Sequence, residues 1–175
     1  RFRFLWPVGR LTAQTEMVAN TYPSTPWLSR KRSSIGRAAG WLLDWPGWTR
    51  DGQRLADAVV VAGLAAAEAN RKRAVVLLLG PTAKDGSLLT PDEARSFLRR
   101  LGVPLEVWSI GKRSPEAQRW KAETLITAYD HRDFDDVVNR LLGEVDRQRI
   151  VWFEGAHMPH EVVPSRLAHG VRLAQ

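Results

Sequence analysis

The segment from Arg71 to Gly111 constrains the fold most strongly, because it has the pattern of a strand, a loop, a helix and a second strand. Its first part, AVVLLL at 74–79, is a continuous apolar run typical of a central parallel strand. The sequence TPDE at 90–93 has a threonine cap, a proline in the first turn and a glutamate three residues after the cap, and so predicts an amphipathic helix. Gly102 ends that helix, and residues 103–111 (VPLEVWSIG) predict the next strand.

Further elements precede and follow this segment. Residues 49–70 predict a helix with Asp51 as its candidate cap, and the absence of charge from Ala58 to Ala67 indicates burial on several sides. Apolar residues at helical spacing between Phe134 and Val145 predict a later helix, and residues 147–155 (RQRIVWFEG) predict a last strand. Strands that alternate with helices predict an α/β fold: three-layer and Rossmann-like, with a mainly parallel sheet and helices on both faces.

The amino-terminal part has weaker patterns. Phe2, Phe4 and Trp6 alternate with polar or smaller residues, which predicts a half-buried strand over residues 1–8 that forms a hairpin with residues 16–22. A short helix is expected within residues 29–48, where three tryptophans form a core-facing stripe or, alternatively, an aromatic recognition platform. With 175 residues, the chain fits one domain over residues 1–155, followed by a C-terminal extension at 156–175.

The charge balance leaves two interpretations open. A net charge of +7 favours acidic partners, including nucleic acid, but the cations are spread along the chain as on an ordinary solvated surface. No helix-turn-helix or RNA-recognition signature accompanies the charge, which argues against nucleic acid. No apolar run approaches the ~18 residues of a spanning helix, so no membrane insertion is expected. The candidate basic patch consists of Arg30, Lys31, Arg32, Arg71, Lys72 and Arg73.

Motifs of enzymes and cofactor sites are missing from the sequence. The loop after residue 79 contains neither a phosphate-binding Gly-Lys-Ser/Thr nor a G-x-G-x-x-G, and no G-x-S-x-G occurs. His157 and His160 are separated by Met-Pro in an irregular tail, which is not the spacing of a helical zinc motif. The acidic run at 133–136 is explained by the positive end of a helix dipole. We therefore expect no enzyme activity, and we nominate no catalytic residue, metal or cofactor.

The order of segments resembles a von Willebrand factor type A domain. Residues 71–111 are similar to its second half, where a strand ends in a turn and a helix leads to a strand of "VPLEVWSIG" character, and DGQRLADAVVVAG at 51–63 is similar to a helix start of that family. The resemblance covers residues 1–155 in order of elements and 49–111 in residue pattern. It implies a divergent bacterial member, secreted or periplasmic, whose first strand could lie before Arg1.

The resemblance also implies a degenerate metal site. The family holds Mg²⁺ through D-x-S-x-S after the first strand, a threonine in the second loop and an aspartate after the fourth strand, and hard oxygen ligands suit this cation. Here Gln53 stands in place of the threonine, Gly80 in place of the aspartate, and D-x-S-x-S does not occur. Asp51 and Asp85 are candidates for a shifted site.

The function that the resemblance implies is a non-enzymatic protein interaction or adhesion module that needs no metal. Open α/β sheets bind partners at the carboxyl ends of their strands. The loops expected to meet a protein partner contain Asp51, Gln53, Arg54, Gly80, Thr82, Lys84, Asp85 and Ser87. The alternative is a basic α/β domain that binds a polyanion through the candidate basic patch.

Overall fold

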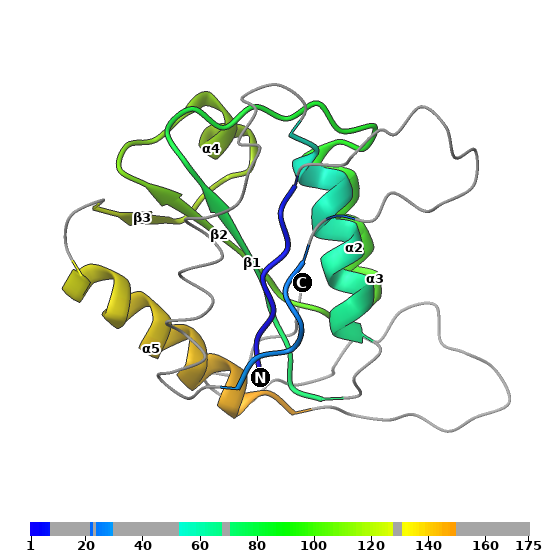
Figure 1. The fold of residues 1–175 in the computed structure, drawn as a ribbon, viewed down its shortest axis with the longest axis vertical. Helices are drawn as coiled ribbons and strands as arrows, with labels where there is room; N and C mark the ends of the chain where they lie inside the picture. Colours follow the sequence, from blue (N-terminus) through cyan, green and yellow to red (C-terminus); the bar gives the residue numbers. More distant parts are fainter. Residues whose placement is uncertain (8–21, 23, 30–52, 68–70, 128–130, 150–175) are drawn as a thin grey trace, which may run out of the picture.

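The computed structural model describes residues 1–7, 22, 24–29, 53–67, 71–127 and 131–149. Helices and strands alternate along the chain, as Figure 1 shows. In chain order, the elements are α2 (Leu55–Ala67), β1 (Val75–Leu79), α3 (Pro91–Arg100), β2 (Leu105–Ile110), α4 (Pro115–Arg119), β3 (Thr124–Ile126) and α5 (His131–Arg147).

The three strands form a parallel sheet in the order β1-β2-β3. Val75 pairs with Leu105 at the start of the β1–β2 ladder, and Trp108 pairs with Thr124 at the start of the β2–β3 ladder. The predicted α/β class with a parallel sheet is confirmed, and the structure is Rossmann-like in a loose sense. Because all three strands run in one direction, the loops that follow them meet at one edge of the sheet.

The main core lies between one face of the sheet and the pair α2 and α3. Alternate residues of β1, Val75, Leu77 and Leu79, are buried there. The two helices approach closely at Gly63, where an added Cβ would lie 2.7 Å from Cδ1 of the buried Leu98. The central part of α2 is thus buried against α3, whereas Leu64 remains 45% exposed. The predicted burial of α2 on several sides is therefore only partial.

The ends of α3 follow the sequence pattern. The Thr90 hydroxyl accepts a hydrogen bond from the Glu93 amide, and the Glu93 carboxylate accepts one from the Thr90 amide at 2.7 Å. Gly102 has a φ of 62°, the left-handed conformation that glycine adopts without a Cβ penalty. Both predicted signals, the capping box and the closing glycine, are confirmed. The capping box fixes the backbone at Thr90, where the preceding loop ends and α3 begins.

Helix α5 lies on the other side of the strands from α2 and α3 (Figure 1). Trp108, whose side chain alternates with that of Val107 in β2, makes an edge contact with Phe134 at a centroid distance of 6.4 Å. Arg140 donates to the Thr124 hydroxyl at 2.9 Å. The predicted helix is confirmed, and the apolar residues of its predicted face are half-buried, apart from Phe134, which is 41% exposed. Because α5 includes Arg147, the strand expected from that residue does not start there. Residues after 149 lie outside the described part.

The amino-terminal segment forms two isolated antiparallel bridges with residues 24–28. Phe2 bridges Leu28 and Leu5 bridges Ser24, both in antiparallel sense. The predicted hairpin with residues 16–22 lies outside the described residues, apart from Tyr22. Trp6 and Leu28 are buried and the flanking Arg1 and Arg3 are exposed, in line with the predicted alternation. The short helix expected within residues 29–48 and the extension at 156–175 are outside the described residues, apart from Ser29.

Two short elements between β2 and α5 were not predicted. Ser114 caps α4 by accepting from the Ala117 amide at 3.1 Å, and the buried Trp120 follows the helix. Strand β3 has three residues, too few for an alternating pattern to stand out.

None of the helices in the described ranges is long and apolar enough to cross a membrane.

Candidate partner-binding loops

The loop after β1, residues 80–90, lies against the start of α2. Gln53 holds it twice, since its carbonyl oxygen accepts from the Gly86 amide at 2.7 Å and its side-chain Oε1 accepts from the Lys84 amide at 3.2 Å. Residues that are far apart in the sequence are thereby joined at the carboxyl end of β1. This is the edge of the sheet at which the sequence predicts partner binding.

Asp85 and Ser87 cap the amino end of α2. The first amides of a helix have no partner within the helix. Here the Leu55 amide donates to Asp85 Oδ1 at 2.9 Å, and the amides of Ala56 and Asp57 donate to Ser87 Oγ at 2.9 and 3.2 Å. The carboxylate also complements the positive end of the helix dipole. The described cap of α2 therefore comes from the loop after β1, whereas the local candidate Asp51 lies outside the described residues.

The same contact is reinforced from the helix side. The Asp57 carboxylate, in the first turn of α2, accepts from the amides of Leu88 and Leu89 at 3.3 and 3.2 Å. Asp85 Oδ1 also accepts from the amide of Ser87 at 2.9 Å. Each side of the contact thus supplies both donors and acceptors, which fixes the backbone of the loop from Lys84 to Leu89.

Tyr22 is buried next to this loop. Burial raises the pKa of its phenol to about 12, and the nearby carboxylates of Asp57 and Asp85 act in the same direction, while the Arg54 guanidinium opposes them. The Tyr22 hydroxyl and Asp85 Oδ2 are both buried without a hydrogen bond to any described residue. The phenol is therefore neutral at physiological pH, and the carboxylates lie against an uncharged group.

The structure brings together most of the residues that the sequence nominates. Gln53, Lys84, Asp85 and Ser87 meet as described above, and the Arg54 amide donates to the Pro7 carbonyl at 2.7 Å. Gly80 lies at the carboxyl end of β1, and its carbonyl accepts from the Ala83 amide at 3.3 Å, which forms a turn. Thr82 and Lys84 are exposed in this loop. Asp51 cannot be placed, because it lies outside the described ranges.

Metal-ligating residues do not gather at these loops in the part of the chain that the structure describes. No group of three or more His, Asp, Glu or Cys side chains there could hold a metal ion. Asp85 Oδ1 already accepts hydrogen bonds from Leu55 and Ser87, and Gly80 brings no side chain to the position that the resemblance assigns to an aspartate. The hydrogen bonds between this loop, Gln53 and the first turn of α2 give the region a fixed backbone.

In the described half of the candidate basic patch, Lys72 and Arg73 form hydrogen bonds to backbone carbonyls of this chain. Arg73 donates to the carbonyls of Ala67 and Leu101 at 3.1 and 3.2 Å, at the carboxyl ends of α2 and α3. Lys72 donates to the Asp146 carbonyl in the last turn of α5. Cations at helix carboxyl ends are favourable because the helix dipole is negative there. Arg71 is exposed, and Arg30, Lys31 and Arg32 are outside the described residues.

Sequence reasoning did not identify Asp57, Tyr22, Leu88 or Leu89 as parts of this region. A signal for the leucines was present, because two adjacent leucines between a polar loop and a helix cap have no place in a buried strand or helix face. Tyr22 and Asp57 gave no signal, since their role depends on contacts far along the chain.

Comparison with known proteins found no matching protein-family model, curated protein or solved structure.

Proposed function

We propose that this protein is a non-enzymatic interaction module of the von Willebrand factor A type, which binds a protein partner through the loops at the carboxyl ends of its strands and needs no metal. In this interpretation the sheet and its helices form a three-layer domain. This function is the one that the resemblance implies. The proposal adds that the loop of residues 80–90 is part of the contact with the partner.

The observation that carries the proposal is the rigid attachment of this loop. Its backbone is bonded to Gln53 and to the first turn of α2, while the side chains of Thr82 and Lys84 are exposed. A preorganised loop loses less backbone entropy when it binds, so more of its contact energy remains as affinity. Open parallel sheets use this edge for binding, which supports the proposal by analogy.

Metal independence is supported by the chemistry at Asp85 and Gly80. Asp85 Oδ1 accepts amide hydrogen bonds and Oδ2 is buried, so a cation at this carboxylate would have to displace those bonds or open the contact between the loop and α2. We expect the thermal midpoint of the protein to be unchanged when chelator is replaced by Mg²⁺, Mn²⁺ or Ca²⁺. A ligand that binds only the folded state must raise that midpoint. A rise with one cation that disappears in Asp85→Asn would contradict metal independence.

The binding function is tested by photo-crosslinking followed by affinity measurement. A photoreactive amino acid at Thr82 is expected to crosslink a partner that the same group at Arg71 does not, because Arg71 is exposed at the opposite, amino end of β1. With the purified partner, Thr82→Ala/Lys84→Glu should lower the affinity by about tenfold or more, and Arg71→Glu should leave it unchanged. The affinity should be the same with chelator present.

Two outcomes would overturn this function. Equal affinity of the partner for the wild type and the loop variant would remove the loop from the contact. Tight binding of a DNA or RNA oligonucleotide that weakens steeply with salt, and weakens further in Arg71→Glu, would favour the polyanion-binding alternative.

A further inference from the structure

Leu88 is presented to solvent from a fixed backbone. Its side chain is 85% exposed, and the next residue, Leu89, is 37% exposed. The amides of both leucines donate to the Asp57 carboxylate, and Thr90 follows as the cap of α3. A single exposed leucine is common on protein surfaces. This one is unusual because the chain is held on both sides of it.

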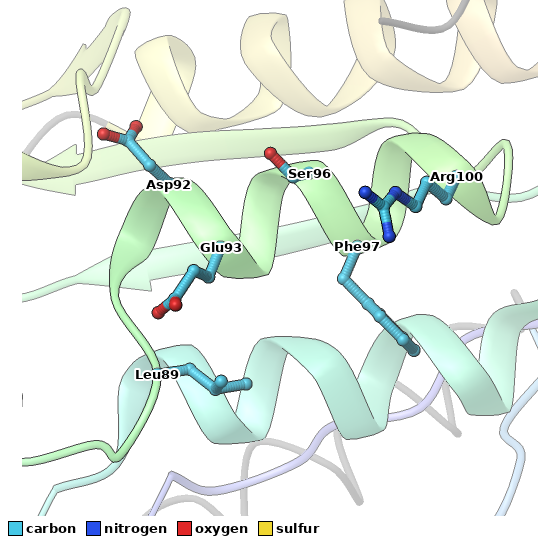
Figure 2. A pocket seen from close by; sticks show the side chains of 6 residues that line it. All are labelled: Leu89, Asp92, Glu93, Ser96, Phe97 and Arg100. Atoms are coloured by element: carbon cyan, nitrogen blue, oxygen red, sulfur yellow. The ribbon is translucent and has the colours of Figure 1, made fainter.

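A groove begins beside Leu89 and runs along α3. It has a volume of about 410 Å³, and its lining residues recur at helical spacing on one side of α3. Figure 2 shows the side chains of Leu89 and Phe97 in the space between α3 and α2. The residues that line it are Leu89, Asp92, Glu93, Ser96, Phe97 and Arg100.

The two ends of the groove have opposite charge. Asp92 and Glu93 lie in the first turn of α3, and Arg100 lies in its last turn. Asp92 has an ion pair with Lys121 at 3.2 Å, but both side chains are largely exposed, so this pair contributes little and leaves the carboxylate open to a second cation. The Glu93 carboxylate accepts from Thr90 through Oε2. An occupant that fits must be apolar in the middle and carry opposite charges at its ends.

We propose that Leu88 and this groove form the docking surface for an amphipathic helix of a protein partner. The inference rests on the proposed binding function and specifies its surface. The ten residues of α3 span ~15 Å, which matches about three turns of a partner helix laid parallel to the groove. Apolar residues of that helix at i, i+3 or i+4 and i+7 contact Leu88, Leu89 and Phe97. A lysine or arginine lies beside Asp92 and Glu93, and an acidic residue beside Arg100.

The probe is a designed helical peptide of about 14 residues, ~21 Å long, with leucines at that spacing, two lysines at one end and two glutamates at the other. Its binding to the whole ¹⁵N-labelled protein is followed by amide chemical shifts. The expected changes are centred on Leu88, Leu89 and Ser96. A peptide of the same composition with its leucines scrambled around the helix is the control ligand.

The variants are placed on exposed side chains, so that folding is preserved. Leu88→Asp should lower the affinity for the peptide by about tenfold or more, and so should Ser96→Arg, which blocks the groove. Leu125→Ser is the matched control, since Leu125 is also exposed, at 46%, but lies on β3 away from the groove. Its affinity for the peptide should equal that of the wild type.

Three results would overturn this inference. The first is the absence of shift changes at millimolar peptide, and the second is equal binding of the scrambled control. The third is self-association of the protein that Leu88→Asp abolishes, because the occupant would then be a second copy of this chain. If the peptide fails while a crosslinked partner still depends on Thr82 and Lys84, only the groove is refuted and the binding function remains.

Discussion

The bonds of Asp85 predict that this residue stabilises the fold from within the proposed binding loop. In Asp85→Ala the Leu55 amide and the Ser87 amide both lose their acceptor. Loss of a helix cap costs about 0.5–2 kcal/mol, and loss of a carboxylate at a helix amino end costs about 0.3–1 kcal/mol. Because the Ser87 hydroxyl still accepts from the Ala56 amide, we expect a net loss of about 2 kcal/mol in the free energy of unfolding.

The size of the effect should depend on what replaces the carboxylate. Asp85→Asn keeps an acceptor oxygen and loses only the charge, so it should cost about 1 kcal/mol or less. Thr82→Ala, a change at an exposed side chain of the same loop, should stay within about 0.5 kcal/mol of the wild type. The assay is equilibrium denaturation in urea, monitored by circular dichroism at fixed pH and salt.

The comparison of the three variants tests the capping explanation. If Asp85→Ala and Thr82→Ala have the same stability, the loop does not cap α2, and the carboxylate becomes available for a ligand. If Asp85→Asn is as damaging as Asp85→Ala, the charge alone matters and the hydrogen bonds contribute nothing. Either result would refute the structural role assigned to Asp85.

Further predictions concern the two faces of the sheet. Gly63→Ala should destabilise the protein by about 1–2 kcal/mol, because the overpacking against Leu98 outweighs the gain in helix propensity. Gly143→Ala in α5, where an added Cβ has no atom within 4 Å, should instead stabilise the protein by about 0.5–1 kcal/mol. Denaturation of both variants checks this pair, and a stabilising Gly63→Ala would contradict the close approach of α2 and α3. Burial, and then the Glu144 carboxylate, raise the pKa of Glu106 above its ordinary 4.5. The folded state therefore binds this proton more tightly, so the stabilising contribution is complete below pH 4.5 and is lost as pH rises through the raised pKa. Glu106→Gln should flatten this pH dependence in denaturation curves, and an unchanged pH profile would show that Glu106 is solvated.

Much of the sheet could be predicted from local sequence, because its signals are local. The apolar run before Gly80 and the capping box at Thr90 need no knowledge of distant residues, and both are found where expected. The start of α5 and its apolar spacing were also visible. Strand β3 was missed because it is too short to show a period. Thus the elements with long or strongly punctuated patterns were the predictable ones.

The candidate site was predictable as a place and not as a set of roles. Gln53 and Asp85 were singled out as positions in a loop, and the structure shows that they bond to backbone amides across the two segments. Such bonds depend on which loop meets which helix, information that no local pattern contains. Asp57 shows the same limit, since an acidic residue in a first helical turn is ordinary until its contact with Leu88 is known.

The cap of α2 by a loop that follows it in the chain has a consequence for folding. During synthesis, α2 is complete before Asp85 and Ser87 have been made, so its first turn lacks these acceptors until the strand after it has formed. Short helices without tertiary contacts are marginal in water. We therefore expect the amino end of α2 to gain its structure late, together with the loop. In the folded protein, a displacement of the loop removes the acceptors of the first α2 amides, so binding at the loop changes the stability of the first turn of α2.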